Sequence, residues 1–261
     1  MQNKVEEYLD TNIKDIMDQY PQVQDILDSF DIGCAPCTSG TCMMRDIIDI
    51  HNLDEQNEKT MLSQIFDVIF PGEKVEIPRI AKEKKAIDSP LSPPLVKLID
   101  EHKLIKRVLV LIPAISEKLD LSKDDNISWV KNIVDFIQNY ADKFHHAKEE
   151  DILFAHYDQS LDIIQVMLKD HVSGRSYAKS MLEAVEEQNT EKARVNLLKY
   201  RDLLTEHIKK EDEILYPWMD RNMDITTVGK MYSQFMNVDT MLPDVPQKYL
   251  VMVEEFETLF E

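Results

Sequence analysis

Four long helical patterns in the C-terminal two thirds of the chain most strongly limit the folds open to it. Apolar residues recur at three- and four-residue spacing over about 95–119, 127–156, 160–188 and 191–220, and short polar segments join these stretches. Long helices with short connections pack as antiparallel neighbours, so the pattern predicts an up-down-up-down four-helix bundle. Only 5 glycines occur among 261 residues, which leaves few tight turns for a β fold and favours an all-α protein.

The N-terminal region is predicted to form a separate small helical domain. Its amphipathic segments begin with a single expected helix over residues 1–19 and end at Pro71-Gly72. The stretch that follows contains several prolines and no sustained periodicity, which is typical of a linker. We therefore expect a small helical domain at 1–72, a linker at 73–94 and a bundle at 95–261, with a C-terminal helical extension formed by about 225–236 and 245–259.

Charge and hydropathy narrow the classes of partner. The chain carries 30 basic and 49 acidic residues, a formal net charge of −19, and so repels nucleic acid and anionic lipid surfaces. The longest apolar run, 108–115, is far shorter than the roughly 20 residues that a membrane span needs. No basic start followed by an apolar stretch opens the chain. We expect a soluble, cytoplasmic protein with no nucleic-acid partner and no membrane association.

Each of the four long helical patterns contains a histidine, and two of these histidines are followed four residues later by a glutamate. Residues at i and i+4 share a helix face, and a turn of about 100° per residue places these side chains on the apolar stripes. On a helical wheel His146 lies about 100° and Glu150 about 140° from His145, so both are expected to lie off the apolar stripe that contains His145. The residues predicted to face the bundle core are His102, His145, Glu149, His171, His207 and Glu211.

Buried imidazoles and carboxylates require compensation, because desolvation without a partner costs several kcal/mol for each group. A bound metal supplies it, and the mixture of nitrogen and oxygen donors suits iron, manganese or zinc rather than calcium. Two octahedral metals have about twelve coordination positions; four imidazoles and two bridging carboxylates fill about eight of them. A bridging oxygen would fill two more and leave roughly two open, which indicates small-molecule chemistry.

The segments EHKLI, HHAKEEDILF, DHVSGRSYAKSM and HIKKEDEILYP resemble the histidine–histidine–glutamate signature of hemerythrin-like di-iron bundles over about residues 90–220. The resemblance implies two non-haem iron ions, an oxo or hydroxo bridge, four terminal histidine ligands, and Glu149 and Glu211 as bridging carboxylates. There is one departure. Oxygen-carrying hemerythrins have a second histidine four residues after the one in the third helix, and Arg175 occupies that position in this chain.

A set of four histidines and two glutamates, together with the order of the domains, resembles the repair-of-iron-centres branch of this family. That resemblance implies a role in nitrosative or oxidative stress, either as a di-iron nitric oxide reductase or in supplying iron to damaged iron–sulfur clusters of a client protein. Reversible binding or sensing of oxygen is the alternative, and a metal-storage or structural site is a third. For nitric oxide reduction and for oxygen binding or sensing, the ligand of the centre is a diatomic gas.

All three cysteines, Cys34, Cys37 and Cys42, lie in a loop rich in Gly, Pro, Ser and Thr ahead of a helix expected from about Met43. The odd count argues against a secreted disulfide scaffold. A Cys-x-x-Cys pair before a helix N-terminus can have lowered thiol pKa values, so redox-active or iron-handling thiols, a structural metal site and inert reduced cysteines all remain open. His51 and His156 have no paired spacing and are interpreted as ordinary surface or loop residues.

Overall fold

The computed structural model describes residues 2–30, 32, 43–51, 53–73, 75–78 and 91–260. The chain forms two compact units: Met1–Pro90 together with Pro217–Asn222, and Leu91–Tyr216 together with Met223–Glu261. The cysteine loop and most of the predicted linker lie outside the described residues, so the expectations for Cys34, Cys37 and Cys42 stay predictions.

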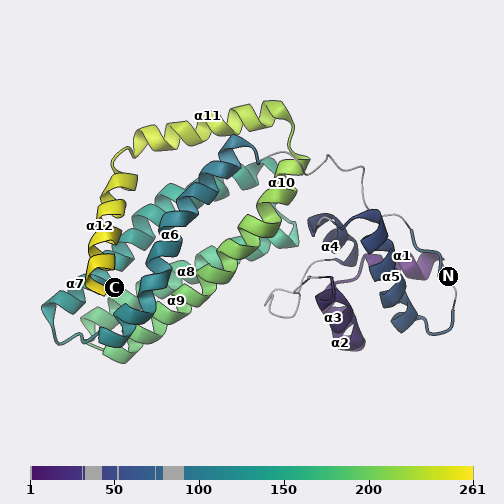
Figure 1. Ribbon diagram of the computed structural model, residues 1–261, viewed down its shortest axis with the longest axis horizontal. Coiled ribbons are helices and arrows are strands. Elements are labelled where there is room, and N and C mark those ends of the chain that lie inside the picture. The colour runs from purple at the N-terminus through teal and green to yellow at the C-terminus, as the bar shows by residue number, and fades with distance from the viewer. Residues whose placement is uncertain are drawn as a thin grey trace. The chain divides into compact units, whose positions relative to one another are not determined.

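The N-terminal unit is built from short helices whose apolar faces share one core. Residues from each of these helices, among them Ile13, Val23 and Phe66, are almost completely buried there. Asp54 caps the longest helix, because its side chain accepts a hydrogen bond from the backbone N–H of Asn57 at 2.8 Å. The helices are α1 (Gln2–Leu9), α2 (Ile13–Gln19), α3 (Gln22–Asp28), α4 (Met44–Ile50) and α5 (Glu55–Ile69) (Figure 1).

The prediction of one continuous helix over residues 1–19 is wrong. The chain leaves the helical conformation after Leu9, and Asn12 has extended backbone angles. The Asn12 side chain accepts a hydrogen bond from the backbone N–H of Lys14 at 2.8 Å and so begins α2. Apolar spacing continues across the break, because both helices bury their apolar residues in the same core.

The second unit contains an all-α four-helix bundle, which confirms the predicted fold class (Figure 1). The first helix packs against the fourth and the second, and the third packs against the second and the fourth, so the four close into a ring. The first is α6 (Pro93–Lys118). The second is α7 (Asp124–Phe136), continued by the π-helical η1 (Ile137–His146) and η2 (Glu149–Leu153) and the short 3₁₀ turn η3 (Phe154–His156). The third is α8 (Asp162–Glu186), and the fourth is α9 (Thr190–Lys210), continued by the π-helical η4 (Glu211–Leu215); α10 (Tyr216–Asn222) follows η4, and its residues from Pro217 on belong to the first unit.

The largest described apolar cluster of the bundle fills one end of the four helices, up to the level of the histidines. It begins in α6 at Leu104, just after His102, and in η1 it ends at Phe144, just before His145. In α8 its buried members begin only at Ala178. Buried apolar residues also lie on the other side of the histidines, so the histidines lie inside a close-packed bundle that holds their helices in place; among these residues are Leu98, Phe154 and Ile164.

Two further helices, α11 (Ile225–Met241) and α12 (Val245–Phe260), complete the second unit. α12 packs against α6 and η1, and α11 packs against α6 and η2. Arg107 on α6 and Glu257 on α12 form a two-pronged ion pair with both hydrogen bonds at 2.7 Å. None of the helices that the structure describes is long and apolar enough to cross a membrane.

Candidate metal centre

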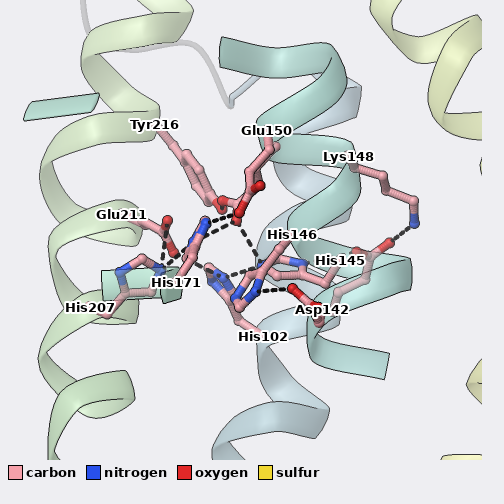
Figure 2. A network of polar contacts seen from close by, with 12 residues as sticks. His102, Asp142, His145, His146, Lys148, Glu150, His171, His207, Glu211 and Tyr216 are labelled. Carbon is pink, nitrogen blue, oxygen red and sulfur yellow. Dashed lines mark hydrogen bonds and ion pairs between the residues drawn. The ribbon is translucent and has the colours of Figure 1, made fainter. Parts of the chain in front are cut away.

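The six residues predicted to face the core lie together in the bundle, each at most 1 % exposed. Figure 2 shows the imidazoles of His102, His145, His171 and His207, one from each of the four helices, gathered close to Glu211. Within the described residues, the metal-binding atoms of these six residues and of His146 fall into two groups, and in each group these atoms lie within 4.8 Å of one another. The first group is His102, His145, Glu149 and Glu211, and the second is His146, His171, His207 and Glu149.

Glu149 lies between the two groups. Its Oε2 is 3.7 Å from Nε2 of His145 in the first group and 3.5 Å from Nε2 of His171 in the second. Its Oε1 accepts a hydrogen bond from the hydroxyl of Tyr216. Only Oε2 is therefore directed at both groups.

Glu211 also lies between the groups, but it uses both of its oxygens. Its Oε2 is 3.4 Å from Nε2 of His102, and its Oε1 is 3.1 Å from Nε2 of His207. One oxygen thus faces each group. This is the placement that a carboxylate needs in order to bridge two cations.

The expectation that His146 lies off the core-facing stripe is wrong. His146 is 5 % exposed, belongs to the second group, and stacks on the ring of His171 with centroids 3.8 Å apart. The reason is the backbone of η1, which is a π-helix over Ile137–His146. A π-helix turns less per residue than an α-helix, so two consecutive residues can both face the core, and an α-helical wheel misplaces them. The fifth imidazole, missing from the position of Arg175, is thus supplied by the second helix.

Every histidine of the cluster faces a carboxylate on its Nδ1 side. Such partners orient the ring and make the opposite nitrogen a better metal ligand. Four of these acids come from a neighbouring helix, and one lies four residues before its histidine on the same helix. The Nδ1-to-oxygen distances are 2.7 Å for His102–Asp212, 3.0 Å for His145–Glu101, 3.5 Å for His146–Asp142, 2.7 Å for His171–Glu150 and 3.4 Å for His207–Asp170.

These outer carboxylates were missed by the reasoning from sequence, although the sequence holds a signal for four of them. Each of the four is the immediate neighbour of an inner residue, so that the same helix turn serves both shells. The pattern consists of an acid just before the histidine on the first and third helices and just after the glutamate on the second and fourth: Glu101-His102, Asp170-His171, Glu149-Glu150 and Glu211-Asp212.

Arg175 does not direct an unpaired charge into the cluster. Its guanidinium pairs with Glu150 at 2.6 Å and with Asp142 at 2.7 Å. These are the outer carboxylates of His171 and His146, so Arg175 ties together two acids of the second group. Its side chain is 40 % exposed, and its charge acts on the outside of the shell.

Burial and mutual charge set the protonation of the imidazoles. Burial lowers the pKa of His145 and of His171 well below the usual histidine value, so both rings are neutral and ready to act as ligands. Burial also opposes the charged form of His207, but the negative charges of Glu211 and Asp170 outweigh it and raise the pKa of His207 to about 9. The cluster thus holds a proton on His207 when no cation replaces it.

The pKa values of the two inner carboxyl groups, Glu149 and Glu211, are shifted in opposite directions. Burial, followed by the negative charge of Glu211, raises the pKa of Glu149 well above its usual value. Burial acts in the same direction on Glu211, but the adjacent His207 and His102 outweigh it and hold the pKa of Glu211 well below its usual range. Two carboxylates this close cannot both keep a full charge without a cation between them.

Unpartnered polar atoms show that the residues fit a metal. Oε2 of Glu149 and both carboxylate oxygens of Glu211 are buried without a properly aligned hydrogen bond. Facing Nε2 atoms are only 2.9 Å apart in His102–His145 and 3.0 Å apart in His171–His207. One proton at most satisfies such a pair, and buried polar groups left unpaired are costly. Cations bound among these nitrogens and oxygens would satisfy all of them.

The other two histidines of the chain lie outside both groups. His156 is exposed at the end of η3, and His51 follows the end of α4 in the N-terminal unit. His156 thus agrees with its interpretation as a surface residue, whereas His51 lies in a turn but is partly buried, and this burial lowers its pKa to about 4.

Comparison with known protein families agrees with the geometry. Residues 94–219 match the family model described as the hemerythrin HHE cation binding domain. This span includes both groups of metal-binding atoms, so the part of the chain that is similar to this family is the part that carries the candidate centre. No curated protein sequence and no solved structure matches the chain.

Proposed function

We propose that the bundle is a hemerythrin-type domain, that it holds a non-haem di-iron centre and that the centre binds a diatomic gas. The observation that carries the proposal is the pair of donor groups with Glu149 and Glu211 between them. Imidazole and carboxylate donors in this proportion suit iron, which supplies redox chemistry and affinity for oxygen or nitric oxide when bound.

The two groups offer unequal numbers of imidazoles, and this favours reversible binding or sensing of oxygen. His102 and His145 serve one metal position, whereas His146, His171 and His207 serve the other. With the carboxylates shared, the position with two imidazoles keeps more room for an exogenous ligand. A single gas molecule at one position fits binding or sensing better than the coupling of two.

The metal position with two imidazoles, that of His102 and His145, is bordered by a buried tyrosine. The ring of Tyr216 stacks on His102, with centroids 5.7 Å apart and planes 11° apart, and its hydroxyl donates to Glu149. Both residues are almost fully buried, so bulk water is excluded from this side of the centre. A dry site strengthens electrostatic interactions with whatever binds there.

Nitric oxide reduction is the second candidate. The closeness of the two groups favours it, because two irons bridged by the same carboxylates can deliver two electrons to one site. Iron supply to a damaged iron–sulfur client in the cytoplasm rests on the resemblance to the repair-of-iron-centres branch and on the cysteine loop. It stays a prediction.

The deciding experiment uses protein purified without oxygen. Metal analysis is expected to give about two irons per chain, as the two donor groups require. Reduced protein mixed with oxygen in a stopped-flow instrument is expected to show an absorption band that disappears again when oxygen is removed. Nitrous oxide formation from nitric oxide, without reversible oxygen binding, would reverse the order of the two candidates. Protein without bound iron after iron-replete expression would contradict both.

Metal uptake is expected to release protons near neutral pH. Without metal, His207 holds a proton up to about pH 9, and the pKa of Glu149 is also raised. Ligands bind in their deprotonated forms, so the metal displaces these protons and its affinity falls as pH is lowered. Between pH 6.5 and 8.5 we expect about a tenfold gain in Co²⁺ affinity per pH unit for each proton released. Calorimetry in two buffers of different ionisation enthalpy measures the proton number, and a value of zero at pH 7 would contradict the assignment.

A further inference from the structure

A chain of alternating charges runs from the surface of the bundle to His145. Lys97 pairs with Oδ2 of Asp239 at 2.5 Å, and Oδ1 of Asp239 pairs with Lys148 at 2.8 Å. Lys148 donates in turn to Oε1 of Glu101, whose Oε2 accepts from Nδ1 of His145 at 3.0 Å. Two ammonium groups and two carboxylates balance one another along this chain.

Lys148 is the central member, and its ammonium group is completely buried. The nitrogen lies 3.5 Å from the centre of the Phe144 ring. A buried ammonium without compensation is strongly unfavourable, so Lys148 depends on its two carboxylates, Glu101 and Asp239. Asp239 holds the ammonium from one side, and Glu101 is thereby held between Lys148 and the ring of His145.

The second group of metal-binding atoms, which contains His207, has a similar lysine and carboxylate but no counterpart of Asp239. The group with His145 and the group with His207 are called the two halves of the centre. Lys210 pairs with Asp170 at 2.9 Å, and Asp170 faces Nδ1 of His207 at 3.4 Å. In both halves the lysine follows its histidine by three residues. The Lys210 side chain, however, is 24 % exposed to solvent, whereas the Lys148 side chain is completely buried. The difference is α11, which carries Asp239 and lies beyond the span 94–219 of the family match.

A cavity of about 600 Å³ lies beside the half that contains His145. Its lining includes Lys97 and Glu101 from α6, Tyr140 from η1 and Tyr232 from α11. Glu101 therefore lines this cavity, and water entering it would compete for the carboxylate if the ion pairs around Glu101 loosened.

We propose that Asp239 is a positioning residue of the metal centre, through which the C-terminal helix α11 acts on one half of it. Asp239 fixes Lys148, Lys148 fixes Glu101, and Glu101 fixes the orientation of the His145 ring. The inference rests on the proposed function, because it takes His145 as a metal ligand. It assigns to the C-terminal extension a role beyond covering the bundle.

The test compares the wild type with single-residue variants of the full chain, each loaded anaerobically with Co²⁺. Paramagnetic Co²⁺ shifts the exchangeable Nδ1 protons of bound histidines out of the crowded proton spectrum, and Glu101→Gln identifies the one from His145. Asp239→Asn is expected to displace this resonance and to speed its exchange with water by about tenfold, since the hydrogen bond of an outer carboxylate is loosened. The resonance of His207 is expected to stay in place.

Glu257→Gln is the matched control. It breaks the ion pair between Arg107 and Glu257, which also joins the C-terminal extension to α6 but leads to no histidine of the centre. All Nδ1 resonances are expected to keep their positions in this variant. An unchanged His145 resonance in Asp239→Asn, or an equal displacement in both variants, would overturn the proposal.

A second variant covers the case in which Asp239→Asn does not fold. Lys148→Met breaks the same chain one step further in, and it is expected to displace the same His145 resonance. A folded Lys148→Met protein with that resonance unmoved would refute the role of Asp239. Wild-type protein that takes up no Co²⁺ would refute the metal centre itself. If the wild type binds Co²⁺ but Asp239→Asn leaves the His145 resonance unchanged, only the role of Asp239 is refuted.

Discussion

Replacing Glu211 with alanine is expected to empty both metal positions. Glu211 directs one carboxylate oxygen at the histidines of each group, so its loss removes a donor from both positions at once. Changes in outer-shell partners already cost 10–100-fold in metal affinity, and the loss of a shared inner ligand is expected to exceed about 100-fold. Iron per folded chain, measured after anaerobic purification, checks this expectation, and circular dichroism verifies that the helices are retained.

Glu213→Ala is the control for this experiment. Glu213 lies on the same π-helical turn as Glu211, but its side chain is exposed and belongs to neither donor group. Its removal is expected to leave the iron content unchanged. Equal iron content in the two variants would mean that Glu211 is not a ligand.

Replacing His146 with alanine is expected to weaken one metal position selectively. His146 belongs to the group that contains His171 and His207, and the group of His102 and His145 does not include it. Loss of one of three imidazoles is expected to lower affinity at that position by at least 10–100-fold while the other position keeps its metal. Stepwise titration with Co²⁺ is therefore expected to separate into one strong and one weak binding event.

His156→Ala provides the comparison, because His156 is exposed and outside both groups. It removes an imidazole from the same helix without touching the centre, and its titration curve is expected to match the wild type. A His146→Ala curve that also matches the wild type would exclude His146 as a ligand. The two metal positions would then be equal in imidazoles, and the preference for binding a single gas molecule would lose its basis.

The inner shell could be predicted from the sequence to the extent that the backbone is regular. His102 and His171 lie on regular α-helix, and His207 with Glu211 and His145 with Glu149 keep the i, i+4 relation. His146 was not predicted as a member of the inner shell, because the sequence gives no sign that η1 forms a π-helix. On a wheel of 3.6 residues per turn His146 lies about 100° from His145, at the edge of the apolar stripe, whereas the wider π-helical turn brings the two residues closer together.

Other features depended on local capping or on contacts distant in sequence. The break before α2 depends on a single side-chain cap at Asn12, which is a weaker signal than the apolar spacing that runs across it. Asp239 lies 91 positions after Lys148, its buried partner, and only the packing of α11 brings the two together. The outer acids could have been found from their adjacency to inner residues.

The outer carboxylates also make the two helical hairpins of the bundle depend on each other. The acids that precede a histidine act within one hairpin: Glu101 on His145, and Asp170 on His207. The acids that follow a glutamate act across the gap between hairpins, as Asp212 does on His102. Each hairpin therefore orients only some of its imidazoles and depends on the other hairpin for the rest. The centre is completed only when both hairpins have docked, so tight metal binding and the final step of bundle assembly are one cooperative event.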